Sequence, residues 1–187
     1  MIVLASASPR RADILSAAGI PFVREVPPGV DETPAPAEPP RDYVTRLAVR
    51  KAEAVAIDSA RIVLGADTTV VVEGEILGKP TGAADAERML RLLSGRAHEV
   101  ITGICFRHSD HHMVDSATTR VWFAELSDRE IAAYVASGEP MDKAGAYGIQ
   151  GLASKFVNRI DGCYFNVMGL PIARVYAHMR DNPSFMI

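Results

Sequence analysis

The chain has 187 residues, of which 48% are hydrophobic and 23% charged, and its formal net charge is −3. This composition supports one globular unit with a sizeable core, or two lobes sharing a core, and excludes an intrinsically disordered chain. With a pI of about 5.9, the chain as a whole lacks the basic footprint of a protein that coats nucleic acid, so a bound phosphate must meet a local basic cluster.

The N-terminal segment predicts a strand, a tight turn and a helix. Residues 2–5 are apolar, Ser8-Pro9 follows, and a helix is predicted over 10–18, where Gly19 ends it. The apolar start is too short for a signal-peptide core or a membrane span, and the two cysteines lie outside any CxxC spacing. We therefore expect a cytoplasmic protein with unpaired thiols and no membrane partner.

A long loop and a second helix come next. Residues 27–40 hold six of the twelve prolines together with several acids, a composition that resists regular structure. Apolar residues and Lys51 then recur at intervals of four on a helix predicted over 41–57. Lys51 therefore projects along an apolar stripe, where the simplest role for it is to cover hydrophobic surface with its stem.

A β-branched run over 62–72 predicts a buried strand, interrupted at residues 65–68 by Gly-Ala-Asp-Thr. Gly74 turns the chain into a short strand over 75–77, and Thr81 is expected to cap a helix that ends at Gly95. The apolar face expected for that helix consists of Ala86, Met89, Leu90 and Leu93.

The remainder alternates between strands and helices. The predicted elements are strands over 98–106 and 118–124 joined by a polar loop, a helix with a Ser127/Glu130 capping box that ends near Gly138, a glycine-rich stretch over 139–151, a strand over 156–160 and a final helix over 167–179. This order indicates the mixed α/β class.

The turn after the first strand has the features of an anion site. Ser8 is a good N-cap and Pro9 suits the first helical position, which leaves backbone donors at a positive helix end. Arg10 and Arg11 add fork-shaped, charge-assisted donors. The alternative is an ordinary cap with solvated arginines, and the glycine and GK[ST] pattern of a Walker A loop is absent.

Asp67 lies between two apolar runs, where a carboxylate is costly to bury unless a metal, a proton or a cation compensates it. A perturbed carboxylate suits a general base, whereas an aspartate that caps a turn is the structural alternative. Lys79 follows the short strand over 75–77 and could face the same cleft. Lys51, Lys79 and the two arginines make four cations, as a triphosphate and its leaving pyrophosphate require.

Glu32, in the proline-rich loop, could supply a further metal oxygen, and oxygen ligands of this kind favour Mg²⁺ or Mn²⁺. A competing metal hypothesis rests on His108, His111 and His112, but they lack a second ligand group at zinc-site spacing, so a solvated turn is the better interpretation. His98, at the start of a strand, is interpreted as a structural hydrogen-bonding residue.

These segments together resemble a known family, the Maf family of nucleoside triphosphate pyrophosphatases. The matching segments run in order over almost the whole chain: Ser6 to Arg11, Lys51-Ala52, Gly65 to Thr68, Gly78-Lys79-Pro80, Ser94-Gly95 with His98 and Thr102-Gly103, and Asn166 to Pro171. A further block, residues 142–151, is similar to the branch of the family that prefers dTTP and UTP.

The resemblance implies one domain over 1–187, with a mixed, strongly bent sheet flanked by helices and a cleft between two lobes. It implies hydrolysis of a nucleoside triphosphate to the monophosphate and pyrophosphate with Mg²⁺ or Mn²⁺. Asp67 takes the proton-acceptor role and is a metal ligand, with Glu32 as a second ligand. The substrate-discriminating positions are Arg10, Thr68 and Gln150, and the phosphate site contains Ser8, Arg11, Lys51 and Lys79.

Two other functions stay open at this point. The chain could be a nucleotide-binding regulator of cell division or septum formation, or a housekeeping enzyme that acts on modified pyrimidine triphosphates such as 5-methyl-UTP and pseudo-UTP. A nucleic-acid partner is not expected, since no cationic strand is interleaved with aromatics. A homodimer is an expectation from the family alone.

Overall fold

The computed structural model describes residues 1–56 and 61–182. Contacts between residues divide the chain into two compact units. Unit 1 comprises Met1–Asp67, Thr102–Ala117 and Gly169–Ile187, and unit 2 comprises Thr68–Ile101 and Thr118–Met168. The boundary within the first long strand falls between two predicted site residues, Asp67 and Thr68.

In the part of the chain that the structure describes, seven strands form a mixed sheet in the order β2-β1-β3-β5-β6-β7, with β4 paired to β3. β1 is parallel to both β2 and β3, whereas the β3–β4 and β6–β7 pairs are antiparallel. The strands are β1 (Ile2–Ala5), β2 (Phe22–Glu25), β3 (Ile62–Val72), β4 (Glu75–Leu77), β5 (Ala97–His108), β6 (His111–Phe123) and β7 (Val157–Asp161).

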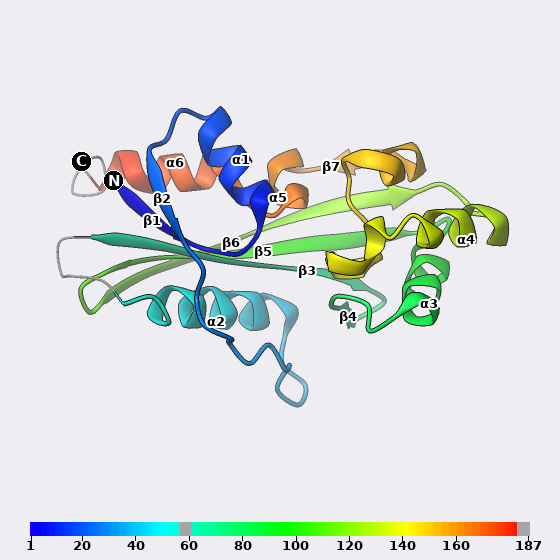
Figure 1. Cartoon of the computed structure of the whole chain (residues 1–187), viewed down its shortest axis with the longest axis horizontal. Coiled ribbons are helices and arrows are strands. Elements are labelled where there is room, and N and C mark those ends of the chain that lie inside the picture. The colour runs from blue at the N-terminus through cyan, green and yellow to red at the C-terminus, as the bar shows by residue number, and fades with distance from the viewer. Residues whose placement is uncertain (57–60, 183–187) are drawn as a thin grey trace. The chain divides into compact units, whose positions relative to one another are not determined.

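Helices accompany the strands in both units, which confirms the mixed α/β class (Figure 1). They are α1 (Pro9–Ala17), α2 (Pro40–Glu53), α3 (Ala83–Leu93), α4 (Asp128–Ala136), α5 (Tyr164–Met168) and α6 (Ile172–Asp181). Short 3₁₀ helices lie at Glu139–Asp142, Ala144–Ala146 and Gly151–Phe156. The predicted bend of the sheet and the cleft between lobes stay predictions.

In unit 1, helix α2 packs directly onto the backbone of the sheet. A Cβ atom at Gly65 of β3 would lie 2.2 Å from the Ala48 carbonyl oxygen, and one at Gly103 of β5 would lie 2.5 Å from the Val44 carbonyl oxygen. Figure 1 shows α2 on one side of the strands and α1 and α6 on the other. Because only glycine permits this approach, Gly65 fixes the distance between α2, which carries Lys51, and the strand that carries Asp67.

Unit 2 has its own core, in which α3 and α4 pack with the ends of the strands and with the irregular segment after α4. The predicted apolar face of α3 is confirmed, since all four of its residues are buried. The capping box of Ser127 and Glu130 is also confirmed, with both reciprocal hydrogen bonds present. Aromatic side chains from different elements meet in this core, among them Phe123, Tyr134 and Phe156.

The structure corrects the predicted strands at three places. β3 runs without interruption from Ile62 to Val72, because a strand accommodates a glycine and a buried aspartate when a helix covers them and supplies a cation. β2 was not predicted, since its four residues include two charged ones. The expected polar loop after residue 106 is mostly strand, and only the two residues between His108 and His111 turn the chain.

The predicted helices differ from the structure mainly at their ends. The structure has two helices, α5 and α6, where one was predicted over 167–179. The break occurs because Gly169 has a φ of 113° and Pro171 lacks an N–H donor, so α6 begins after them. α3 starts after Gly82, and Thr81 donates its backbone N–H to the Asp85 carboxylate instead of capping. Of the helix predicted over 41–57, residue 57 lies outside the described residues.

Candidate active site

Two carboxylates of unit 1 converge on one ammonium group. The Lys51 Nζ atom lies 2.5 Å from Asp67 Oδ1 and 2.6 Å from Glu32 Oε1. The side chains of Lys51 and Asp67 are 13% and 10% exposed, while Glu32 is 43% exposed. The apolar stripe of α2 thus directs Lys51 toward β3, and its charge compensates the carboxylate that the sequence marked as costly to bury.

Burial is the largest influence on the pKa of Asp67 and raises it above its ordinary value, against the opposing attraction of Lys51 and Arg11. The negative charge of Glu32 raises the pKa of Asp67 further. A carboxylate with a raised pKa is a stronger base than an ordinary surface aspartate. Asp67 is therefore placed to accept a proton, with a compensating cation in contact.

Side chains of Ser6 and Arg24 hold the backbone of the turn after β1. Ser8 caps α1 with an extended backbone (φ −68°, ψ 119°) and Pro9 follows it, but the Ser8 side chain makes no cap hydrogen bond. The Ser8 N–H donates to Ser6 Oγ. Arg24 donates to the carbonyl oxygens of Ser6 and Ala7 at 3.0 and 2.5 Å. With its carbonyls engaged in this way, the turn has a fixed shape at the N-terminus of a helix.

Arg11 is buried and braces the same turn. Its Nε donates to the Gly169 carbonyl oxygen at 2.7 Å and its Nη1 to Ser6 Oγ at 3.1 Å. Burial lowers the pKa of Arg11, whereas Asp67 raises it and the like charge of Arg10 lowers it. Arg11 thus lies in the electrostatic field of Asp67, and Arg10 is half-buried beside it.

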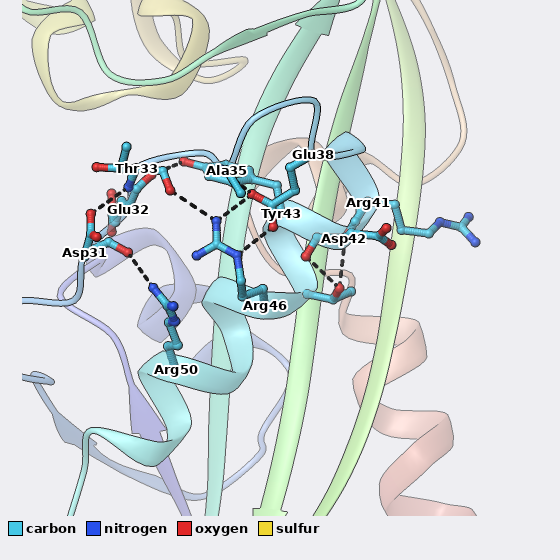
Figure 2. Close-up of polar contacts among 11 residues, drawn as sticks. Asp31, Glu32, Thr33, Ala35, Glu38, Arg41, Asp42, Tyr43, Arg46 and Arg50 are labelled. Carbon is cyan, nitrogen blue, oxygen red and sulfur yellow. Dashed lines mark hydrogen bonds and ion pairs between the residues drawn. The ribbon is translucent and has the colours of Figure 1, made fainter.

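The proline-rich segment that carries Glu32 is attached to α2 by polar contacts (Figure 2). Arg46 binds both carboxylate oxygens of Glu38 at 2.6 Å and donates to the Thr33 carbonyl oxygen. The Tyr43 hydroxyl donates to the Glu32 carbonyl oxygen at 2.9 Å, and Arg50 donates to that of Asp31. Successive turns of α2 therefore hold the backbone on both sides of Glu32.

In unit 2, one glycine links the segments that carry the other predicted residues. Gly145 has a φ of +68°, and a Cβ atom there would lie 2.7 Å from Val70 Cγ2. Its N–H donates to the Gly78 carbonyl oxygen at 3.0 Å. Val70 is two residues beyond Thr68 on the same face of β3, and Gly78 immediately precedes Lys79. Gln150 is exposed, five residues beyond Gly145.

The structure therefore groups the predicted site residues in two sets. Unit 1 brings Glu32, Lys51 and Asp67 into direct contact, with Arg11 nearby. Unit 2 connects the segments that carry Thr68, Lys79 and Gln150 through the contacts of Gly145. The sequence analysis missed two sets of supporting residues. Arg24 was missed because β2 was not predicted, and the α2 residues that hold the proline-rich loop were missed because contacts to a loop leave no periodic pattern in the sequence.

The histidines of the β5–β6 hairpin form no metal centre with their neighbours in residues 1–56 and 61–182, where no group of three or more His, Cys, Asp or Glu side chains is arranged to hold an ion. His112 instead approaches Glu53 at 3.5 Å. Across the same described ranges, no helix combines the length and apolar character needed to span a membrane.

These features identify a class of protein. The model of the family described as "Maf-like protein" matches residues 1–182, and the chain belongs to this Maf family.

Three relatives illustrate how closely it matches members of that family, and each is named dTTP/UTP pyrophosphatase. The protein of Syntrophomonas wolfei is 56% identical over 176 residues, which cover 92% of this chain and 93% of the relative. That of Koribacter versatilis is 53% identical, with 96% and 93% covered. That of Geobacter sulfurreducens is 52% identical, with 96% and 95% covered.

Proposed function

We propose that this chain is a pyrophosphatase that hydrolyses dTTP and UTP to the nucleoside monophosphate and pyrophosphate. The relatives that carry this activity in their names match it over nearly its full length at 52 to 56% identity. The single structural observation that supports the proposal best is the buried Asp67, which has a raised pKa and is in contact with Lys51.

In the proposed reaction, Asp67 accepts a proton from a water molecule whose oxygen attacks the α-phosphorus. A bond forms between that oxygen and the α-phosphorus while the bond to the bridging oxygen of the β-phosphate breaks, and pyrophosphate leaves with the electron pair. Ser8, Arg10, Arg11, Lys51 and Lys79 are proposed to bind the phosphates and stabilise the negative charge of the leaving group.

The donor set fits the divalent cation that the family resemblance implies. Glu32 and Asp67 both contact Lys51 Nζ, so the fold already directs two carboxylates at one positive charge. Mg²⁺ is commonly held by one or two carboxylates together with substrate phosphates and water, and these two residues would hold Mg²⁺ or Mn²⁺ in that manner. When bound, the ion supplies Lewis-acid polarisation of the phosphate oxygens.

Gln150, Thr68 and Arg10 are proposed to select the nucleotide. The Gln150 amide offers one donor and one acceptor group, which can complement the adjacent carbonyl and N–H of uracil or thymine. Cytosine presents these groups differently, so a hydrogen-bonding site discriminates against it. If Gln150→Ala left the ratio of UTP to CTP hydrolysis unchanged, this reading of the base would be wrong.

The proposal is tested by incubating the purified protein and Mg²⁺ with single nucleotides and measuring pyrophosphate and monophosphate. We expect UTP and dTTP to be cleaved in preference to CTP and GTP. Binding of UTP without pyrophosphate release would contradict the proposal and favour the regulator of cell division. Much faster cleavage of 5-methyl-UTP or pseudo-UTP would instead assign the cellular role to modified nucleotides. Cytoplasmic location and a homodimer stay predictions from the sequence.

A further inference from the structure

The segment that carries Gln150 is anchored in the core of unit 2 by a hydrogen-bonded pair of rings. Nε2 of His98 and the hydroxyl of Tyr147 are 2.7 Å apart, in a buried hydrogen bond between residues 49 positions apart in the chain. His98 is 2% exposed and Tyr147 is 5% exposed. This hydrogen bond ties the Tyr147 ring to the start of β5.

Phe123 completes a cluster of three rings. Its ring centroid lies 4.7 Å from that of Tyr147 and 5.0 Å from that of His98, and each pair meets edge to face. The His98 and Tyr147 centroids are 5.3 Å apart at an interplanar angle of 83°. Aromatic rings prefer this arrangement, and three mutual contacts leave the Tyr147 ring little freedom to tilt.

Both partners are neutral near neutral pH. Burial lowers the pKa of His98 to about 4, and burial raises the pKa of Tyr147 beyond its ordinary value. Two neutral partners keep this hydrogen bond unchanged around neutral pH. Because both side chains are buried, this hydrogen bond orients the two rings strongly.

The backbone next to Tyr147 is strained and must be held by its surroundings. Ala146 is fully buried and has a φ of 57°, a left-handed conformation that is unfavourable for a residue with a side chain. Gly145 beside it is also left-handed and rests on Val70. A strained conformation of this kind persists only where several neighbouring contacts hold it in place. The hydrogen bond between Tyr147 and His98 is one of those contacts.

Gln150 follows Tyr147 by three residues, and a second anchor comes directly after it. Ile149 is buried, whereas Gln150 is exposed. Beyond Gln150, the Leu152 N–H donates to Glu139 Oε2 at 3.0 Å. The exposed amide thus lies on a short stretch of chain fixed at both ends, and only the anchor before it is buried in the core.

We propose that His98 and Tyr147 are positioning residues for nucleotide selection, which hold the Gln150 amide at the orientation needed to read the pyrimidine base. The inference rests on the proposed function of Gln150 and adds two residues that do not touch the nucleotide. It explains why a histidine is buried at the start of β5: its imidazole supplies a neutral hydrogen-bonding partner that fits beside two aromatic rings.

The test compares Tyr147→Phe with the wild-type protein. The variant keeps the ring and removes only the hydroxyl, so the fold is expected to persist. We expect the ratio of kcat/KM for UTP to that for CTP to fall by about three- to tenfold, mainly through kcat/KM for UTP. Ser94→Ala is the matched control, because it removes another hydrogen bond of unit 2, from the Leu126 N–H to Ser94 Oγ.

A second pair of variants separates positioning from stability. His98→Gln places an amide near the Nε2 position and should restore much of the UTP preference, whereas His98→Met should lose it. Thermal denaturation is measured for every variant. A ratio that falls equally in Ser94→Ala, or a ratio unchanged in Tyr147→Phe, would overturn the inference.

Hydrogen exchange keeps this outcome distinct from failure of the proposed function. Amides 146–150 should exchange faster in Tyr147→Phe than in the wild-type protein and in Ser94→Ala, whether or not the protein hydrolyses nucleotides. Absence of wild-type turnover would refute the proposed function. Wild-type UTP preference with unchanged exchange and an unchanged ratio in Tyr147→Phe would refute the positioning role alone.

Discussion

Two long irregular segments carry predicted site residues, and different kinds of contact hold them in place. Residues 27–40, with Glu32, are tied to α2 by arginine ion pairs and hydrogen bonds near the surface. Residues 139–151, with Gln150, are fixed by buried rings and by a glycine packed on β3. Ionic and polar contacts thus hold the segment that carries Glu32, whereas core packing holds the segment that carries Gln150, the residue proposed to read the base.

The largest expected effect concerns the charged region. Asp67→Asn keeps the shape of the side chain and removes its basicity, so we expect kcat for UTP to fall by about 100- to 10,000-fold. Asp115→Asn serves as the control, since that carboxylate in unit 1 pairs with Arg174 and His178 instead. Steady-state kinetics measure kcat for both variants. Retained turnover in Asp67→Asn would contradict both roles proposed for Asp67, proton acceptor and metal ligand.

Lys51→Gln tests the charged region through the contact between Lys51 and Asp67. Lys51 lowers the pKa of Asp67, so its loss should raise that pKa and move the acid limb of the kcat/KM profile toward higher pH. We expect kcat/KM at neutral pH to fall by about 100-fold, because a phosphate-binding cation is lost as well. A pH profile of both proteins measures the effect. An acid limb that stays in place or moves to lower pH would show that Asp67 does not control it.

Gly65→Ala tests the close packing that brings α2 to β3. A Cβ atom 2.2 Å from the Ala48 carbonyl oxygen forces a backbone shift, and we expect the free energy of unfolding to fall by about 3 kcal/mol or more. Gly29→Ala, in the proline-rich segment, has no atom within 4 Å of its new Cβ and should change little. Urea denaturation compares them, and equal midpoints would contradict the packing argument.

Glu38→Gln tests the surface attachment and should have the smallest effect. Hydrogen bonding to Arg46 holds the pKa of Glu38 at about 2, below its ordinary value of 4.5. A depressed carboxylate pKa stabilises the fold above the ordinary value, and this contribution is lost as the pH falls toward 2. We expect a cost of about 1 kcal/mol or less at neutral pH, which shrinks on acidification.

That prediction is checked by urea denaturation of both proteins over a range of pH. Arg88, which forms exposed ion pairs with Glu75 and Asp85 in unit 2, offers a control. Arg88→Gln should leave the region around Glu32 and the UTP kinetics unchanged. A stability difference between Glu38→Gln and the wild-type protein that grows toward acidic pH would contradict the stabilising role of the ionised Glu38 carboxylate.

Periodic patterns predicted most elements because local spacing determines them. The apolar face of α3 and the capping box of α4 depend on intervals of three and four residues, and both are confirmed. β2 was missed because two of its four residues are charged, and its place beside β1 depends on a parallel pairing across the intervening helix α1. The continuity of β3 was likewise hidden, since the packing of α2 on Gly65 is a tertiary contact that local spacing does not reveal.

The candidate site was predictable where residue type alone signals chemistry. An aspartate between apolar runs indicated a buried charge that needs compensation, and the structure brings Asp67 and Lys51 into contact. The position of Lys51 on an apolar stripe had indicated only a stem that covers hydrophobic surface. The supporting contacts were not predictable, because Arg24, Arg46 and Tyr147 act through backbone carbonyls or distant side chains. The roles assigned to the site residues stay predictions that kinetics must test.

The central claim is that Asp67 activates a water for attack on the α-phosphorus of a pyrimidine triphosphate. The most direct measurement uses UTP, the purified protein, Mg²⁺ and water labelled with heavy oxygen, followed by mass spectrometry of the products. We expect UMP and pyrophosphate, with the label on UMP, and product formation slower by about 100-fold or more in Asp67→Asn. Label on the pyrophosphate, or release of UDP and phosphate, would contradict it.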